Sequence, residues 1–307
     1  VCPKLSAYMK IAAVVVTYNR KILLGSCLQA IENQTRKPDH LFLVDNASTD
    51  NISDYVRELE ITIPLTYIRL EHNIGGAGGF YTGMKRAYDT HLYDAVWVMD
   101  DDGEPDSKCL SNLLKYVDEY PYISPLVVCT DDDSKLAFGT LGSVDVYSLK
   151  DKYQNGIIFN HANPFNGVLF RNDFIEKVGF PKKEMFIWGD ENEYEARGYS
   201  RGFTSITVLD AIHKHPKDRL VLYKDFLGRE KIIWVESELR RYCKYRNTAY
   251  VLKTYKGWLN LIFYIFRYSL FFMINRRLDC KGFNLFLKAV SAGITNQFEG
   301  HWKYIRR

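Results

Sequence analysis

Four short apolar segments recur along the first hundred residues, and stretches with a different spacing of apolar residues separate them. The segments are rich in β-branched residues, and their length suits buried strands. The stretches between them place apolar side chains three and four positions apart, which is typical of amphipathic helices. The predicted strands are residues 11–16, 40–44, 65–70 and 95–99. This alternation predicts a mainly parallel α/β sheet with both faces covered.

Each predicted strand leads into a polar or glycine-rich loop. These loops are residues 17–20, 45–50, 73–79 and 100–102. The carboxyl ends of parallel strands meet at one edge of a sheet, where ligands bind in folds of this class. We therefore expect the functional side chains to gather at that edge.

The pattern is more mixed beyond residue 120. Residues 165–170 and 203–212 predict strands, and residues 172–179 predict a helix that ends at a glycine. Residues 190–197 predict a helix whose acidic first turn suits the helix dipole. We expect a catalytic domain over 9–218 and a helical, aromatic and basic region over 219–307.

Charge divides the chain at nearly the same place. Residues 1–212 hold 21 Lys and Arg against 30 Asp and Glu, a net charge of −9, whereas residues 213–307 hold 20 against 7, a net charge of +13. A basic C-terminal region indicates an anionic partner. We exclude nucleic acid because the chain carries no RNA- or DNA-binding module pattern.

Residues 258–274 are almost wholly apolar but contain Arg267. The segment is short for a spanning helix, and a central Arg is costly in a bilayer. Two interpretations remain: a buried helix of the C-terminal region, or an amphipathic helix that lies on an anionic membrane surface.

The composition is that of a globular chain, with 47% hydrophobic and 25% charged residues among 307, so disordered, collagen-like and repeat classes are excluded. Six scattered cysteines form no CxxC pair, which argues against a zinc ribbon or redox dithiol and for a reducing compartment. Residues 1–8 show no secretory signal. We expect a cytoplasmic location.

Three adjacent carboxylates follow the strand at 95–99. In an extended segment Asp100 and Asp102 point the same way, so they could flank a hard divalent cation. A solvated turn is the alternative, since residues 131–133 are also three aspartates. The strand end favours a metal site at the first triplet. After the strand at 203–212, His213 or His215 could complete it, and we rank His213 first.

The glycines at 75, 76, 78 and 79 would let the backbone approach a phosphate, although the loop matches neither the dinucleotide fingerprint nor the P-loop and could be a flexible turn. The acidic segment at 188–193 offers Glu191 and Asp190 as general bases, with Trp188 as a wall of an acceptor pocket. Dipole compensation is the alternative for these carboxylates.

These segments together resemble the family 2 glycosyltransferases, which have the GT-A fold. The matching pieces occur in family order over roughly residues 10–216. They are VVVTYNR, LVDNASTD, NIGGAGGF, the DDD after AVWVM, FNGVLF, WGDENEY and HKHP. The glycine-rich and acidic pieces look most like the galactofuranosyltransferase branch, with rhamnosyltransferases the nearest competitor.

The resemblance implies a nucleotide-sugar donor, usually a UDP-sugar, and Mn²⁺ or Mg²⁺. The residues it places at the donor are Thr17, Arg20, Asp45, Asn73, Gly75, Gly76, Gly78, Gly79 and Asp101. Asp100 and Asp102 would be the metal ligands, joined by His213 or His215. Glu191 matches the family's base, but many relatives have Asp there, so Asp190 stays a candidate.

The expected activity is metal-dependent transfer of a sugar, galactofuranose by resemblance, to a glycan hydroxyl with inversion at the anomeric centre. The acceptor would be a glycan or lipid-linked glycan of the bacterial envelope, and the enzyme would rest on the inner leaflet of the plasma membrane. The alternatives are a rhamnosyltransferase that uses dTDP-rhamnose, a sugar nucleotidyltransferase, and a non-catalytic binding module.

Overall fold

The structure is a computed structural model that describes residues 9–140, 143–163, 165–217, 221–225 and 228–305. Its contacts form two compact units. The N-terminal unit comprises Val1–Pro181 and Gly198–Asp218, and the C-terminal unit comprises Lys182–Arg197 and Arg219–Arg307. The acidic segment thus groups with the C-terminal unit, whereas we had expected it within a domain spanning 9–218.

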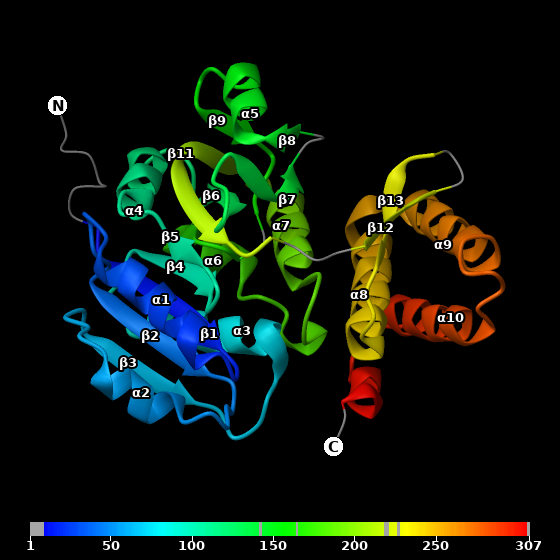
Figure 1. Cartoon of the computed structure of the whole chain (residues 1–307), viewed down its shortest axis with the longest axis horizontal. Coiled ribbons are helices and arrows are strands. Elements are labelled where there is room, and N and C mark those ends of the chain that lie inside the picture. Colours follow the sequence, from blue (N-terminus) through cyan, green and yellow to red (C-terminus); the bar gives the residue numbers. More distant parts are fainter. Residues whose placement is uncertain (1–8, 141–142, 164, 218–220, 226–227, 306–307) are drawn as a thin grey trace. The chain divides into compact units, whose positions relative to one another are not determined.

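The first half of the N-terminal unit is a parallel sheet in the order β3-β2-β1-β4 (Figure 1). The strands are β1 (Ile11–Thr17), β2 (His40–Asp45), β3 (Leu65–Arg69) and β4 (Ala95–Asp100). Both neighbours of β1 run parallel to it, with Thr17 beside Asp45 and Val16 beside Asp100. The predicted parallel sheet is confirmed, and its carboxyl edge collects the loops named above.

The second half makes the sheet mixed. Strand β10 (Val168–Arg171) lies antiparallel between β4 and β6 (Tyr122–Cys129), and β11 (Ser205–His215) runs parallel to β6. The two-residue strand β5 (Glu104–Pro105) pairs antiparallel with β11, with Pro105 beside His213. The chain just after the aspartate triplet is therefore fixed against the histidine-bearing end of β11. The remaining strands are β7 (Lys135–Thr140), β8 (Ser143–Asp145) and β9 (Ile157–Phe159).

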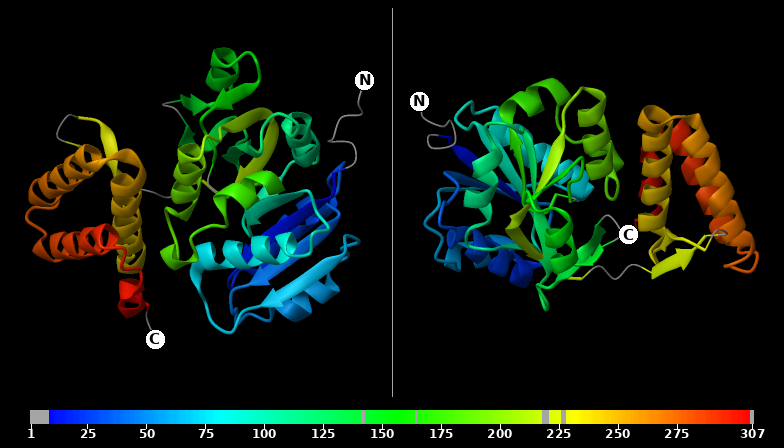
Figure 2. Two further views of the ribbon diagram at one scale, coloured as in Figure 1. Left: turned by 180° about the vertical axis from the view of Figure 1, so that it is seen from behind. Right: turned by 90° about the horizontal axis from the view of Figure 1, so that it is seen from above.

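Helices cover both faces of this sheet (Figure 2). Side chains alternate across a strand, so Ile11, Ala13 and Val15 of β1 share one core with the buried side of α1, whereas Val14 and Val16 face α3. The helices of the N-terminal unit are α1 (Lys21–Glu32), α2 (Ile52–Glu58), α3 (Gly75–Tyr88), α4 (Cys109–Leu113), α5 (Val146–Lys152) and α6 (Asn172–Val178). Helix α7 (Asp190–Ser200) begins in the C-terminal unit. As predicted, α6 ends before a glycine, Gly179, with a φ of +86°.

Helix α3 begins five residues earlier than the sequence pattern predicted, because the glycine-rich segment is its first turn rather than a loop. A Cβ at Gly79 would lie 2.4 Å from Cγ1 of Val16, and one at Gly83 would lie 2.3 Å from Cγ1 of Val14. Both glycines therefore allow α3 to pack closely on β1.

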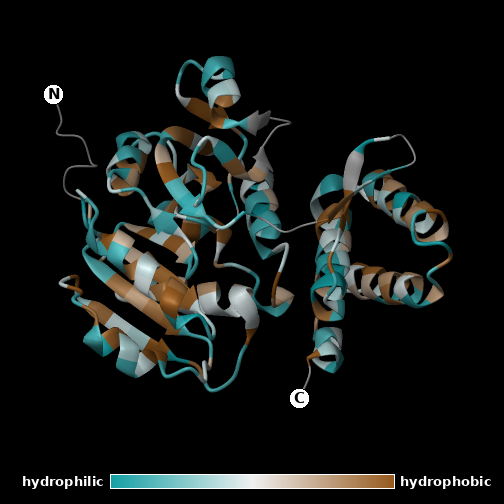
Figure 3. Cartoon of the chain, viewed as in Figure 1, coloured by the Kyte–Doolittle hydropathy of each residue, from teal (hydrophilic) through white to brown (hydrophobic). Residues whose placement is uncertain are grey.

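The C-terminal unit consists of a β-hairpin and three long helices around an aromatic core. Its elements are β12 (Val221–Lys224), β13 (Glu230–Trp234), α8 (Glu238–Val251), a π-helical segment (Leu252–Lys256), α9 (Trp258–Met273), α10 (Cys280–Ile294) and a 3-10 helix (Glu299–Tyr304). Helix α9 buries Leu261, Tyr264, Tyr268 and Phe271 in that core. Other positions of the same helix are also hydrophobic (Figure 3). None of the helices in the described ranges is long and apolar enough to cross a membrane.

Candidate active site

Asp101 joins the ends of β4 and β1. Its buried carboxylate accepts hydrogen bonds from the Thr17 hydroxyl (2.7 Å), the Tyr18 backbone N–H (3.3 Å) and the Arg20 guanidinium (3.3 Å). Thr17 is itself almost completely buried. Thr17 and Asp101, both predicted at the donor site, therefore fix the conformation of the sheet edge. Arg20 is half-exposed, so its guanidinium can reach a phosphate.

Asp102 lies between the side chains of Arg20 and His215. One carboxylate oxygen accepts from Arg20 Nη1 at 2.7 Å, and the other lies 3.3 Å from His215 Nε2. Burial raises the pKa of Asp102, but the interactions with His215 and Arg20 together bring the pKa below its usual range. The interaction with Asp102 raises the pKa of His215 against the opposing effect of burial.

His215, rather than His213, is the histidine beside the aspartates. His213 is fully buried, and a Cβ at Gly103 or Gly167 would lie 2.1 or 2.7 Å from its ring nitrogens. Burial lowers the pKa of His213 to about 3, so its ring is neutral and packed between two glycine-containing segments. The structure thus places His215 at ion-pair distance from Asp102 and His213 in a tightly packed buried position, and which of the two completes a metal site stays a prediction.

The surroundings of Asp100 strongly raise the pKa of its carboxyl group. Burial raises its pKa to about 8, and the charges of Asp102 and Asp101 add to the effect. Three carboxylates at one strand end repel each other unless positive charge is near. This is the environment in which a bound cation is favourable.

The residues at this edge fit a divalent ion held mainly by its substrate. Among the described residues no group of three or more His, Cys, Asp or Glu side chains is arranged to hold a metal. Within the described residues, the Asp102 oxygen that faces His215 is buried and lacks a well-directed hydrogen bond, so it can serve as a ligand. Mg²⁺ and similar ions commonly take one or two protein carboxylates and complete their shell with phosphate oxygens and water.

We predict that Asp100→Asn stabilises the free protein at alkaline pH. Because the folded-state pKa of Asp100 lies above its ordinary 3.8, folding loses stability as pH rises from that value towards about 8. The variant should melt several degrees higher than the parent at about pH 8 and show a smaller difference at about pH 5. Equal differences in melting temperature at both pH values would contradict this assignment of charge.

Asp45 is fully buried at the end of β2, and its carboxylate is already hydrogen-bonded. It accepts from the Ser48 backbone N–H (2.7 Å), the Tyr67 hydroxyl and Arg69 Nη1 (2.7 Å). Burial and the bond to Asp45 raise the pKa of Tyr67 to about 12. Tyr67 and Arg69 escaped the sequence analysis because they lie on the neighbouring strand β3.

Asn46 connects β2 to the start of α3. Its side chain donates to the Gly75 carbonyl (2.9 Å) and accepts from the Ile74 backbone N–H (2.9 Å), while Asn73 accepts from the Gly75 N–H (2.8 Å). A Cβ at Gly76 would meet no atom within 4 Å. Gly76, unlike Gly78 and Gly79, thus has open space beside it among the described residues.

The glycines at 75, 78 and 79 have different environments. Gly75 has a φ of +76°, which favours glycine, whereas a Cβ at Gly78 would lie 2.6 Å from the Ile74 side chain. Gly79 packs on Val16, as described above. The geometry accounts for these three through backbone conformation and packing, so their predicted contact with the donor stays a prediction.

The acidic segment starts helix α7 in the C-terminal unit. Asp190 is buried, whereas Glu191 is partly exposed and accepts hydrogen bonds from the Gly189 backbone N–H (3.1 Å) and from Asn192 (3.2 Å). Glu193 is buried, and its carboxylate is bound by Arg197 and by the Tyr255 hydroxyl. Glu191 is therefore the most exposed of the three carboxylates.

Trp188 precedes this helix with an unusual backbone. Its φ of +62° is left-handed, a conformation that costs a non-glycine residue on the order of 1–3 kcal/mol. Its side chain is partly exposed, which is compatible with the predicted wall of an acceptor pocket.

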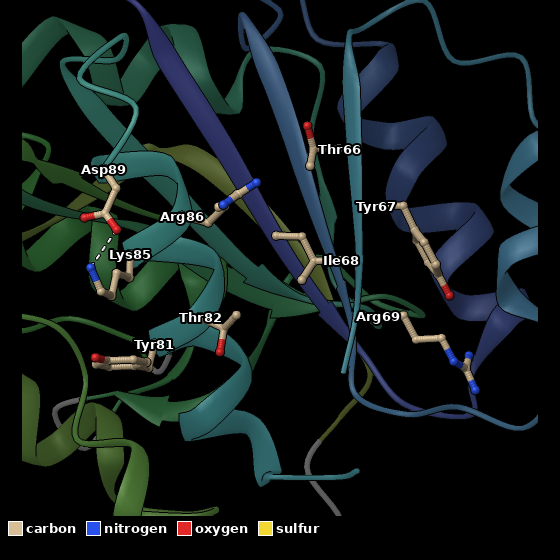
Figure 4. A pocket seen from close by; sticks show the side chains of 9 residues that line it. All are labelled: Thr66, Tyr67, Ile68, Arg69, Tyr81, Thr82, Lys85, Arg86 and Asp89. Atoms are coloured by element: carbon tan, nitrogen blue, oxygen red, sulfur yellow. Dashed lines mark hydrogen bonds and ion pairs between the residues drawn. The ribbon is translucent and has the colours of Figure 1, made fainter. Parts of the chain in front are cut away.

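A separate pocket of about 530 Å³ lies between β3 and α3 (Figure 4). Thr66 and Ile68 point to the α3 side of the strand, and Tyr67 and Arg69 point to the other side. None of the predicted site residues lines this pocket. This pocket and the predicted site residues therefore do not coincide.

Comparisons with known proteins identify the family and the fold. Residues 12–177 match the family "Glycosyl transferase family 2". The chain is 32% identical to galactofuranosyltransferase GlfT1 of Mycolicibacterium smegmatis over 94% of this chain and 98% of that protein. It is 35% identical to galactofuranosyltransferase GlfT1 of Mycobacterium tuberculosis over 88% of this chain and 90% of that protein.

Solved structures show the same fold at low sequence identity. The structure of S. aureus TarS 1-349 in complex with UDP-GlcNAc has a TM-score of 0.61 at 15% identity and covers 97% of this chain and 84% of that one. Mannosyltransferase PcManGT from Pyrobaculum calidifontis, in complex with GDP-Man and Mn²⁺, has a TM-score of 0.55 at 16% identity and covers 97% and 79%.

The fold is that of the GT-A glycosyltransferases. The chain belongs to glycosyl transferase family 2. The predicted fold, family and enzyme class are confirmed.

Proposed function

We propose that this enzyme transfers galactofuranose from UDP-galactofuranose to a hydroxyl group of a glycan acceptor, with a divalent metal ion and with inversion. The relatives named galactofuranosyltransferase GlfT1 support the sugar, because the similarity extends over nearly the whole of both chains. The observation that carries the chemistry is the position of Asp102 between Arg20 and His215 at the end of β4.

In the proposed reaction, the acceptor oxygen forms a bond to the anomeric carbon while the bond from that carbon to the diphosphate oxygen breaks. UDP leaves, and Glu191 takes the acceptor proton. Asp102 and Asp100 would hold the metal through carboxylate oxygens, with His215 beside Asp102, and the metal would neutralise charge on the diphosphate when bound. Arg20 would add a second positive charge at the same group.

A donor screen tests this function. Thermal unfolding is followed with UDP-galactofuranose, UDP-galactopyranose and dTDP-rhamnose, each with and without Mn²⁺. Binding to the folded state raises the melting temperature by mass action, so the first donor with Mn²⁺ should give the largest shift. A larger shift with dTDP-rhamnose would favour the rhamnosyltransferase, and transfer in excess chelator would contradict metal dependence.

The outer face of α9 supports the further proposal that the enzyme rests on an anionic membrane, where a lipid-linked glycan acceptor would lie. Leu259 is 83% exposed, Ile262 59% and Phe266 49%, although all three are apolar. Lys256 and Arg277, both exposed, lie just before and after the helix. An apolar helix face with cations beside it is the arrangement that binds anionic bilayers in the interfacial plane.

We predict that Ile262→Glu weakens binding to vesicles rich in anionic lipid about tenfold. The substitution removes apolar area that binding would bury in the bilayer, and it adds a negative charge that the anionic lipids repel. Co-sedimentation with phosphatidylglycerol vesicles measures the effect, and transfer to a soluble acceptor should be unchanged. Leu92→Glu is the control, since Leu92 is 60% exposed in the N-terminal unit. Equal binding by both variants would contradict a membrane face on α9.

A further inference from the structure

The backbone that leads into the acidic helix α7 is strained at a non-glycine residue. Phe186 has a φ of +67° and a ψ of −73°, and the Ile187 N–H donates to the Met185 carbonyl at 2.9 Å. These values define a γ-turn of the rare, strained kind. Trp188 follows with a second positive φ, so two of the four residues before Asp190 are in unfavourable conformations.

Two neighbouring residues of α8 hold this strained segment in place. Asn247 Nδ2 donates towards the carbonyls of Met185 (3.0 Å), Ile187 (3.1 Å) and Trp188 (2.7 Å). Arg246 Nη2 donates to the Met185 carbonyl as well, at 2.7 Å. Both side chains are fully buried, so these bonds are shielded from competing water.

The rest of the Arg246 guanidinium is anchored in the C-terminal unit. Nη1 donates to the Phe298 carbonyl (2.6 Å), and Nε donates to Asn247 Oδ1 (2.9 Å). The Phe186 ring stacks on His301 with centroids 4.4 Å apart. Side chains of α8 therefore bind the backbone of the turn, and His301 of the 3-10 helix packs on the Phe186 ring.

A second contact fixes the helix itself. The Tyr255 hydroxyl, in the π-helical segment after α8, donates to Glu193 Oε1 at 2.8 Å. Glu193 also binds Arg197 one turn later in α7. The chain between α8 and α9 thus reaches the same acidic helix at a different point.

We propose that Arg246 and Asn247, supported by Tyr255, are positioning residues that orient the start of α7 for catalysis. On this view the C-terminal unit is part of the catalytic apparatus and not only a membrane-binding appendage. The inference rests on the proposed function, in which Glu191 or Asp190 is the base. A base displaced by about an ångström loses much of its rate advantage even when the substrate still binds.

The test is Asn247→Asp. The substitution keeps the shape of the side chain and its contact with Arg246, and it supplies a counterion to a buried guanidinium, so the fold should persist. It removes the amide donors to the three carbonyls. We expect kcat to fall about 10- to 100-fold while the donor KM stays within about twofold. Asn284→Asp, an exposed site on α10, is the matched control and should keep both constants.

Tyr255→Phe gives an independent reading, because losing one hydroxyl does not threaten folding. It should lower kcat by a smaller factor, again with the donor KM unchanged. A kcat equal to that of the parent enzyme in both variants would overturn the proposal. Equal losses in donor affinity and in kcat would also overturn it. If Glu191→Gln and Asp190→Asn both retained activity, the proposed base would have failed instead, so the two failures are distinguishable.

Discussion

Replacing Asp102 with Asn is expected to lower glycosyl transfer about 10³-fold, which corresponds to about 4 kcal/mol of lost transition-state stabilisation. The substitution removes negative charge from the carboxylate that lies 2.7 Å from Arg20 and 3.3 Å from His215. Turnover with UDP-galactofuranose, measured over a range of Mn²⁺ concentrations, should show both a lower maximal rate and a weaker dependence on the metal. Circular dichroism should show an intact fold.

The chain supplies its own control for this experiment. Asp133 belongs to the other aspartate triplet and is exposed in a turn, so Asp133→Asn makes the same chemical change away from the strand end. It should transfer sugar at the parent rate. Asp102→Asn with a rate within about threefold of the parent would contradict the proposed role, since a charged ligand at the diphosphate contributes several kcal/mol.

The parallel half of the sheet could be predicted from sequence because its signals are local. The segments at 11–16, 40–44, 65–70 and 95–99 are mainly apolar and lead into polar or glycine-rich loops, and each became a strand. The aspartate triplet could be predicted for the same reason, since it directly follows one of them. Periodicity and turn chemistry depend only on neighbours along the chain.

The choice between His213 and His215 could not be made in this way. The two residues are two positions apart on one strand, so alternation gives them the same side. What separates them is packing against Gly103 and Gly167, which come from other parts of the chain. The same difficulty applies to the glycines of α3. Glycine is expected both where a helix packs closely on β1 and in an open loop, so the sequence does not distinguish the two.

Asn247 carries no local signal at all. An asparagine inside a helix usually indicates nothing more than a solvated face, and its three carbonyl partners lie about sixty residues earlier. The grouping of segment 182–197 with the C-terminal unit depends on such long-range bonds. A single sequence specifies them only through the completed fold.

Glu191→Gln is expected to reduce kcat by about 10²- to 10⁴-fold, the range over which a positioned general base contributes. Glu191 is partly exposed at the first turn of α7, where backbone N–H groups and the contact with Gly189 steady its carboxylate. Gln keeps the size of the side chain but cannot accept the proton. The donor-induced thermal shift should be unchanged, because the donor contacts are proposed at the other unit's sheet edge.

Asp190→Asn distinguishes the two candidate bases. Asp190 is buried at the start of α7, so we expect its substitution to affect stability more than the chemical step. The pH dependence of kcat gives the discriminating readout, since the acidic limb reports the base and should disappear only when the base is removed. Glu299→Gln, at an exposed position in the same unit, is the matched control. A parent-like pH profile in Glu191→Gln together with an inactive Asp190→Asn would transfer the role of base to Asp190.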